Sequence, residues 1–255
     1  MTTVQSGTGL IDLFEDFTGP EEIFAETHAS GNIGGGPFRV VGDGLTDASA
    51  DSGVAIDEAT APLNGVGILT TTNEDKHGTY IATAKALDVA TMGPIVMECR
   101  VQFADLDAKA FFFGLCSVNE DALSLEDDVV VGSGTTIAYN ASAEMCAFYY
   151  DEALTDDEDW HTIYTGGVAA AVTDSTAIDL DNKAVLGEWQ VLKMEVDPSG
   201  TARFFIDNDL LSTVVGAVST TTDLAMVCGV EARASTNELA YIDYVSLRAN
   251  RNWTV

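Results

Sequence analysis

The chain has 255 residues, of which 41 are acidic and 11 are basic, so its formal net charge is -30. A surface this acidic repels nucleic acid and anionic membranes, so we expect neither as a partner. It suits a solvated surface, a salty medium or a partner with a basic face. Hydrophobic residues make up 46% of the chain, enough for a sizeable core. They fall in short runs interrupted by Gly, Thr, Ser and Asp, which is typical of an all-β fold.

The N-terminal part of the chain predicts an arm followed by a strand. Residues 1–9 are small and polar, so we expect an arm there and one domain over residues 10–255. Leu10 to Phe17 predicts the first strand, and glycine-rich and acidic loops dominate the connection to residue 64. The chain does not begin with a basic and apolar leader, so no signal peptide is expected. No apolar run reaches transmembrane length.

The middle of the chain contains clearer strand patterns. Gly65 to Thr72 and Gly78 to Ala84 flank a short turn, which predicts a β-hairpin. Ala86 to Met92 predicts one helical turn. Pro94 to Ala104 alternates between apolar and polar residues, so one face of this strand should meet the core. Ala110 to Ser117 is almost entirely apolar, which predicts a central, buried strand.

The last third, Gly187 to Trp253, predicts a run of antiparallel strands in one sheet. Asp197-Pro198-Ser199-Gly200 is a strong turn signal, because proline presets φ and glycine takes a left-handed position. A second corner is expected at Asp207-Asn208-Asp209, where asparagine tolerates a positive φ. The final strand changes the phase of its alternation near Asp243, which predicts a β-bulge.

The sequence contains no recognisable catalytic motif. The glucanase chemistry of two carboxylates on one strand face needs a spacing such as E-x-D-x-x-E, which is absent. HExxH, GxSxG and P-loop motifs are also absent. We therefore expect no enzymatic activity. The four cysteines form no CxxC pair and lie among apolar residues, which predicts buried free thiols at Cys99, Cys116, Cys146 and Cys228.

Two sets of residues are candidates for ligand binding. Calcium is the most plausible ion, and no other cofactor is expected. Its candidate ligands lie in two acidic stretches that do not match an EF-hand, and solvated loops are the alternative; they are Asp156, Asp157, Asp159, Asp179 and Asp181. The aromatic residues that could stack on a sugar are Tyr149, Tyr150, Trp160 and Tyr164. A buried position in the core is the alternative for each of these aromatics.

The last third resembles the concanavalin A-like lectin/glucanase jelly roll. The resemblance rests on a strand that opens with Trp189 and ends in Asp197, and on a corner at Phe204–Asp207. The family usually has glycine after this corner, where the chain has Asn208. Residues 242–245 match the apolar-Asp-x-Val element of the family's last strand, and Phe14–Gly19 looks like its first strand. The resemblance implies a two-sheet antiparallel jelly-roll β-sandwich, all-β, whose first and last strands lie side by side.

Domains of this type also occur in tailed-phage virions, and this analogy guides the functional prediction. We expect a non-enzymatic virion structural protein, either a capsid decoration (cement) protein or an accessory protein. It would be made in the host cytoplasm, form a homo-oligomer and bind capsid or tail subunits. A lectin-like carbohydrate-binding module for host adsorption is the alternative, with a glycan as its partner. A glycan-active enzyme with a non-standard site is a third hypothesis.

Overall fold

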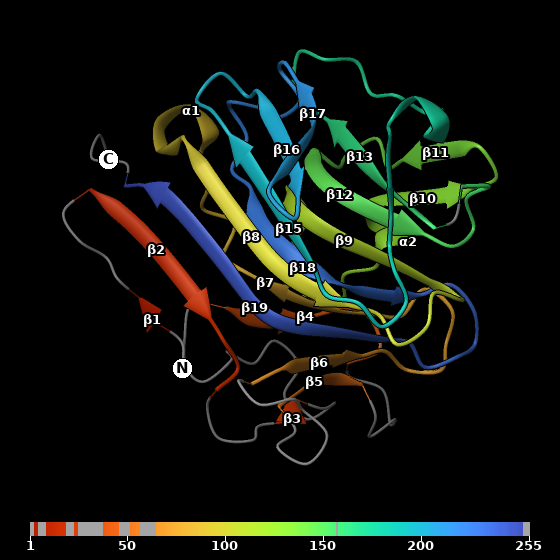
Figure 1. Ribbon diagram of the computed structural model, residues 1–255. Helices are drawn as coiled ribbons and strands as arrows, with labels where there is room; N and C mark the ends of the chain where they lie inside the picture. Colours follow the sequence, from red (N-terminus) through yellow and green to blue (C-terminus); the bar gives the residue numbers. More distant parts are fainter. Residues whose placement is uncertain are drawn as a thin grey trace.

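The computed structural model describes residues 3–4, 9–18, 23–24, 38–45, 52–56, 65–156 and 158–251. These residues form two antiparallel β-sheets packed face to face (Figure 1). The α-helices of the described residues are single turns, α1 (Val89–Met92) and α2 (Leu125–Asp128). No helix in this part of the chain is long and apolar enough to cross a membrane. The predicted all-β jelly-roll sandwich is confirmed.

The first sheet has ten strands, and Figure 1 shows its long central strands β8 and β19 side by side. Its path runs β17-β16-β15-β8-β19-β6-β5-β3, with β2 beside β19 and β1 beside β2. The strands are β1 (Thr3–Val4), β2 (Leu10–Glu15), β3 (Ile23–Phe24), β5 (Gly53–Ile56), β6 (Gly67–Thr70), β8 (Ile95–Gln102), β15 (Gln190–Val196), β16 (Ala202–Ile206), β17 (Asp209–Val214) and β19 (Leu239–Asn250). The first and last long strands therefore pair, as the resemblance implied.

The second sheet has seven strands in the order β14-β13-β12-β9-β18-β7-β4. They are β4 (Arg39–Val41), β7 (Gly78–Ala82), β9 (Lys109–Cys116), β12 (Met145–Asp151), β13 (Asp159–Thr165), β14 (Asp179–Lys183) and β18 (Ala225–Ala232). A separate hairpin consists of β10 (Val130–Ser133) and β11 (Thr136–Tyr139). It lies at the right of the view in Figure 1, close to α2.

The burial of each strand follows its sequence pattern. Strand β8 alternates between buried and half-buried residues, so its apolar side faces the other sheet, as predicted. Strand β9 is buried along its whole length, because it lies between β12 and β18 and has both faces covered. The four cysteines are buried and free, which confirms the prediction for them.

The predicted turns and bulge are present in the ten-stranded sheet. The Asp197 carboxylate accepts hydrogen bonds from the backbone N–H groups of Ser199 (2.9 Å) and Thr201 (3.1 Å). Asp207 and Asn208 both have positive φ, at 51° and 73°, and form the β16–β17 corner. The pairing of β19 with β8 shifts register between residues 242 and 244, which is the predicted bulge.

Two predictions of strand pairing are wrong. Residues 65–72 and 78–84 do not form a hairpin, because β6 lies in the ten-stranded sheet and β7 in the seven-stranded sheet. All five residues of β7 are buried, and its hydrogen-bonding edges are paired with β4 and β18. Likewise β18 does not belong to the sheet of the other C-terminal strands. Its eight buried residues require a central position, which it takes between β9 and β7.

The N-terminal arm is described only at Thr3, Val4 and Gly9. Thr3 and Val4 pair with Phe14 and Leu13 of β2, so this short piece extends the ten-stranded sheet. The other residues of the predicted arm lie outside the described residues.

Candidate functional site

A segment of the chain covers the outer face of the seven-stranded sheet. We call this segment, residues 118–140, the cap; it contains α2, β10 and β11. Backbone hydrogen bonds hold it at both sides: Asp43 N–H donates to Leu123 O (2.9 Å), and Ile137 N–H donates to Thr173 O (2.8 Å). The sheet residues Phe112 and Tyr149 are fully buried. The cap thus fills this face of the sandwich with the protein's own side chains.

Buried polar groups fasten the cap to the sheet. The Glu231 carboxylate accepts hydrogen bonds from the Tyr80 hydroxyl (2.8 Å) and from the backbone N–H groups of Leu125 and Glu126 at the start of α2. Burial raises the pKa of Glu231 to about 8. The hydrogen bonds from Leu125 and Glu126 make the Glu231 side chain the anchor for the first turn of α2.

A second carboxylate, Asp151, is also fully buried. It accepts hydrogen bonds from the Tyr149 hydroxyl (2.5 Å), Gly132 N–H (2.9 Å), Ala153 N–H (3.0 Å) and Arg233 Nε (3.1 Å). Four donors saturate this carboxylate, so it holds β10 against β12.

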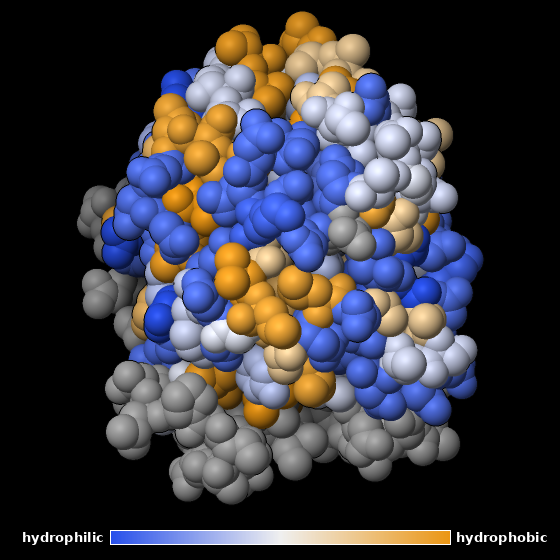
Figure 2. Space-filling view, turned by 45° about the vertical axis from the view of Figure 1, so that its right-hand side comes forward, coloured by the Kyte–Doolittle hydropathy of each residue, from blue (hydrophilic) through white to orange (hydrophobic). Residues whose placement is uncertain are grey.

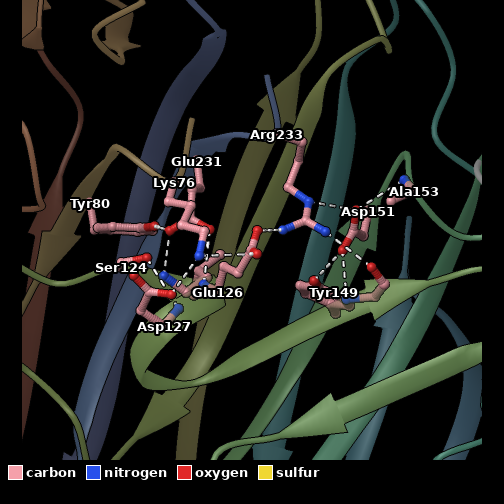
Figure 3. Close-up of polar contacts among 12 residues, drawn as sticks. Lys76, Tyr80, Ser124, Glu126, Asp127, Tyr149, Asp151, Ala153, Glu231 and Arg233 are labelled. Atoms are coloured by element: carbon pink, nitrogen blue, oxygen red, sulfur yellow. Dashed lines mark hydrogen bonds and ion pairs between the residues drawn. The ribbon is translucent and has the colours of Figure 1, made fainter. Parts of the chain in front are cut away.

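Arg233 joins the two parts of this network. Figure 3 shows its guanidinium between the carboxylates of Glu126 and Asp151. Its third contact is a hydrogen bond to Gly132 O (3.0 Å). Each of these acids has partners on both the sheet and the cap or on Arg233, so the network holds the cap against the sheet.

The aromatic residues predicted to stack on sugar are core residues. Tyr149, Tyr150 and Trp160 are at most 1% exposed, and Tyr164 is 8% exposed. The Trp160 ring packs against Phe103, Phe111 and Phe148. The prediction of an exposed stacking platform is wrong for these four residues, because the opposite sheet covers one face of β12 and β13 while the cap and loops cover the other.

The calcium candidates lie around the β13–β14 ladder. Asp156 is 3.3 Å from His161 Nε2, while Asp181 N–H donates to Asp179 Oδ1 (2.7 Å). Burial, together with the neighbouring Asp179, raises the pKa of Asp159. Asp157 lies outside the described residues. The residues that the structure does describe include no group of three or more His, Cys, Asp or Glu arranged to hold a metal. Calcium binding stays a prediction of the sequence.

An open hollow of about 560 Å³ lies on the outer face of the ten-stranded sheet. Side chains of β2, β8, β15 and β19 line it, and those strands are neighbours in the sheet. Its charged lining residues are Asp12, Glu98, Lys193 and Arg248. The others are Phe14, Val96, Tyr244 and Ser246.

The hollow combines an aromatic wall with paired charges. The Phe14 and Tyr244 rings stack with centroids 5.8 Å apart, and the Tyr244 hydroxyl donates to Glu98 Oε1 (2.6 Å). Burial, and then the Glu98 carboxylate, raise the pKa of Tyr244, so its hydroxyl stays protonated. Arg248 Nε donates to Asp12 Oδ1 (3.2 Å). The bulge at residues 242–244 puts Tyr244 on this outer face while Ile242 and Val245 stay in the core.

Sequence reasoning missed the hollow because its lining comes from both ends and the middle of the chain. The pairing of the strands places these residues side by side. Ser246 is opposite Glu98 on one side and Phe14 on the other, and Glu98 is opposite Lys193. The sequence did offer one signal for the hollow. The expected pairing of the first and last strands places their outward-facing residues next to those of β8 and β15.

Two stretches that meet at one end of the molecule contain no charged residue of their own, although Arg203 and Glu144 lie beside them. Residues 165–173 and 210–222, which we call the uncharged end, lack Asp, Glu, Lys and Arg. The two stretches lie together, since Ala169 N–H donates to Gly216 O (2.8 Å) and Gly166 bridges to Val218. Val168 is 96% exposed and Val215 is 76% exposed. Figure 2 shows apolar side chains at the top of the molecule, where this end lies.

Comparison with known proteins defines the fold class. No protein-family model matches the chain, and no curated protein sequence matches it. A protein of unknown function from Shewanella oneidensis MR-1, SO2946, is similar in structure, with a TM-score of 0.60 and 12% identity over 100% of this chain and 92% of that one. The Bacillus licheniformis β-glucanase has a TM-score of 0.52 and 12% identity over 97% of this chain and 100% of that one.

A third similar structure comes from a phage. It is the carbohydrate esterase vb_24B_21 of the Shiga toxin-encoding bacteriophage phi24B, with a TM-score of 0.50 and 16% identity over 91% of this chain and 100% of that one. Together these likenesses place the chain in the concanavalin A-like/glucanase fold class. At such low identity they define the fold and not the activity.

Proposed function

We propose that the protein is a non-enzymatic structural component of a phage virion, which binds neighbouring capsid or tail subunits as a decoration or accessory protein. The observation that carries this proposal is the uncharged end. On a chain with a net charge of -30, stretches without charged residues of their own can be buried against another subunit with few ions to desolvate. Exposed Val168 and Val215 supply apolar area for that contact.

Two further observations support a structural role. The cap fills the outer face of the seven-stranded sheet, and its buried carboxylates are engaged in holding it there. The similarity to a phage protein supports the viral setting. In this proposal the protein is made in the host cytoplasm, assembles as a homo-oligomer and keeps its acidic surface toward the medium, where repulsion between virions prevents aggregation.

A carbohydrate-binding role is the second candidate function. The open hollow favours it, because it combines stacked aromatic rings with polar groups. Two of the similar proteins, a β-glucanase and a carbohydrate esterase, act on carbohydrates.

The presence of the chain in particles tests the proposed function. Virions of the phage that encodes this chain are purified on a gradient and analysed by quantitative mass spectrometry. The chain is expected in a fixed ratio to the major capsid protein. A protein that acts only during infection would stay in the soluble fraction. Absence of the chain from washed particles would contradict the proposal.

A further inference from the structure

We propose that the outer edge of β17 accepts an extended segment of a neighbouring virion subunit as an added β-strand. This inference rests on the proposed function and names the contact by which the uncharged end binds. β17 is the last strand of the ten-stranded sheet, and Figure 1 shows it beside β16. An edge strand has one row of backbone N–H and C=O groups without a neighbouring strand, and a strand from a partner can pair with that row.

The hydrogen bonds of β16 show which groups of β17 form the free row. Asp207 N–H donates to Val191 O (2.9 Å), so the backbone groups of Asp207 point toward β15. Because this direction alternates along a strand, and β15 and β16 pair without a register shift, the backbone groups of Arg203 also point toward β15. Arg203 is opposite Thr213 in the β16–β17 ladder. The N–H and C=O of Thr213 therefore point away from β16, toward the open edge.

The open edge is accessible to a partner. Thr213 is exposed, and the backbone of Thr213 has no hydrogen-bond partner among the residues that the structure describes. Leu210 is 53% exposed and Val215 is 76% exposed, so apolar side chains flank Thr213 on both sides. An added strand would satisfy the free backbone groups and cover these side chains together.

The outermost strand of the other sheet is protected against such pairing. That strand, β14, carries Asp179, Asp181 and Lys183 within its five residues. Charged side chains on an edge strand oppose pairing with another chain. β17 has such a residue only at its start, Asp209, and residues 210–215 are uncharged. β17 thus lacks the protection that β14 has, and it lies in the uncharged end.

The chemistry of β17 defines the partner segment. The segment should be uncharged and rich in Val, Ile or Thr over the length of β17, six residues. Asp209 begins β17 and Asp207 lies in the adjoining corner, so a lysine or arginine at that end of the segment would be attracted. A second copy of this chain fits the edge less well, because each copy has a net charge of -30 and the two would repel each other.

Two substitutions at Thr213 test the proposal on particles stripped of the protein. Thr213→Pro removes the outward N–H and keeps the ladder with β16, because an edge strand accepts proline where the N–H faces outward. Its affinity for particles in co-sedimentation should fall about tenfold, since a carbonyl of the partner strand loses its donor. Thr213→Val is the matched control, because it keeps the N–H, and it should bind like the parent.

Hydrogen exchange gives a readout that needs no variant. The Thr213 amide proton is expected to exchange fast in the free chain and at least about tenfold more slowly on particles, because it gains a hydrogen bond there. The Val214 amide faces β16 and should change less. Mass spectrometry with fragmentation to single residues measures both rates.

The proposal is overturned if Thr213→Pro binds particles like the parent or if the Thr213 amide is not slowed on them. It is also overturned if the parent forms a dimer that Thr213→Pro lacks, which would make a second copy the occupant of the edge. If Val168→Asp/Val215→Asp loses binding while Thr213→Pro keeps it, the proposed function stands and strand addition is wrong. A parent chain that does not bind particles would overturn both.

Discussion

Replacing Arg233 by methionine is expected to lower the free energy of unfolding by about 3–5 kcal/mol. The substitution removes the cation that lies between Asp151 and Glu126, and Asp151 is fully buried. A buried carboxylate that loses its partner keeps the cost of desolvation without the compensating attraction. Urea denaturation, followed by tryptophan fluorescence, measures the change.

The control is Arg203→Met in the other sheet. Arg203 is 3.8 Å from Asp197, and both side chains are partly exposed, so its loss should cost less than about 1 kcal/mol. Hydrogen exchange adds a local readout: in Arg233→Met, the amide protons of Gly132 and Ile137 should exchange faster, because the cap is less firmly held. Equal losses of stability in the two variants would show that the network does not hold the cap.

Replacing Trp160 by alanine is expected to cost about 3–5 kcal/mol of stability, the range for removing a large aromatic side chain from a core. Trp160 is fully buried among other aromatic rings, and its Nε1 donates to Gln190 Oε1 (3.1 Å). The cavity left behind would lie between the two sheets. Thermal and chemical denaturation both measure the loss.

Trp189 provides a comparison within the same residue type. It precedes β15 and is half-buried, with the Arg100 guanidinium 4.9 Å from its ring centroid. Trp189→Ala is expected to cost about 1 kcal/mol, as for an exposed cation–π contact. A larger loss in Trp189→Ala than in Trp160→Ala would mean that the core assignment is wrong.

Local patterns in the sequence predicted individual strands well. The alternation of β8, the continuous apolar run of β9 and the phase change in β19 are each determined by neighbouring residues, and each matches the structure. The choice of sheet is a long-range property. The connection between β6 and β7 is short enough for a hairpin, yet it crosses from one sheet to the other.

The main error at the candidate site was the prediction that aromatic residues of β12 and β13 are exposed. It arose because both faces of these strands are buried. Tyr149 faces away from the inter-sheet core, so a sandwich without a cap would expose it. Its burial depends on the cap, whose attachment through Glu231 and Arg233 spans about a hundred residues of sequence and has no local signal. The hollow escaped prediction for the same reason, since Arg248 and Asp12 come from opposite ends of the chain.

The claim that the uncharged end attaches the protein to a virion is tested most directly by reconstitution. Particles stripped of the protein are mixed with the parent chain, with the Val168→Asp/Val215→Asp variant, or with Thr135→Asp/Ala141→Asp, which adds the same charge at exposed positions elsewhere. The parent and the control are expected to co-sediment with particles at a saturable ratio, and the first variant is expected to remain in the supernatant. Binding of Val168→Asp/Val215→Asp at the parent's level would contradict the account.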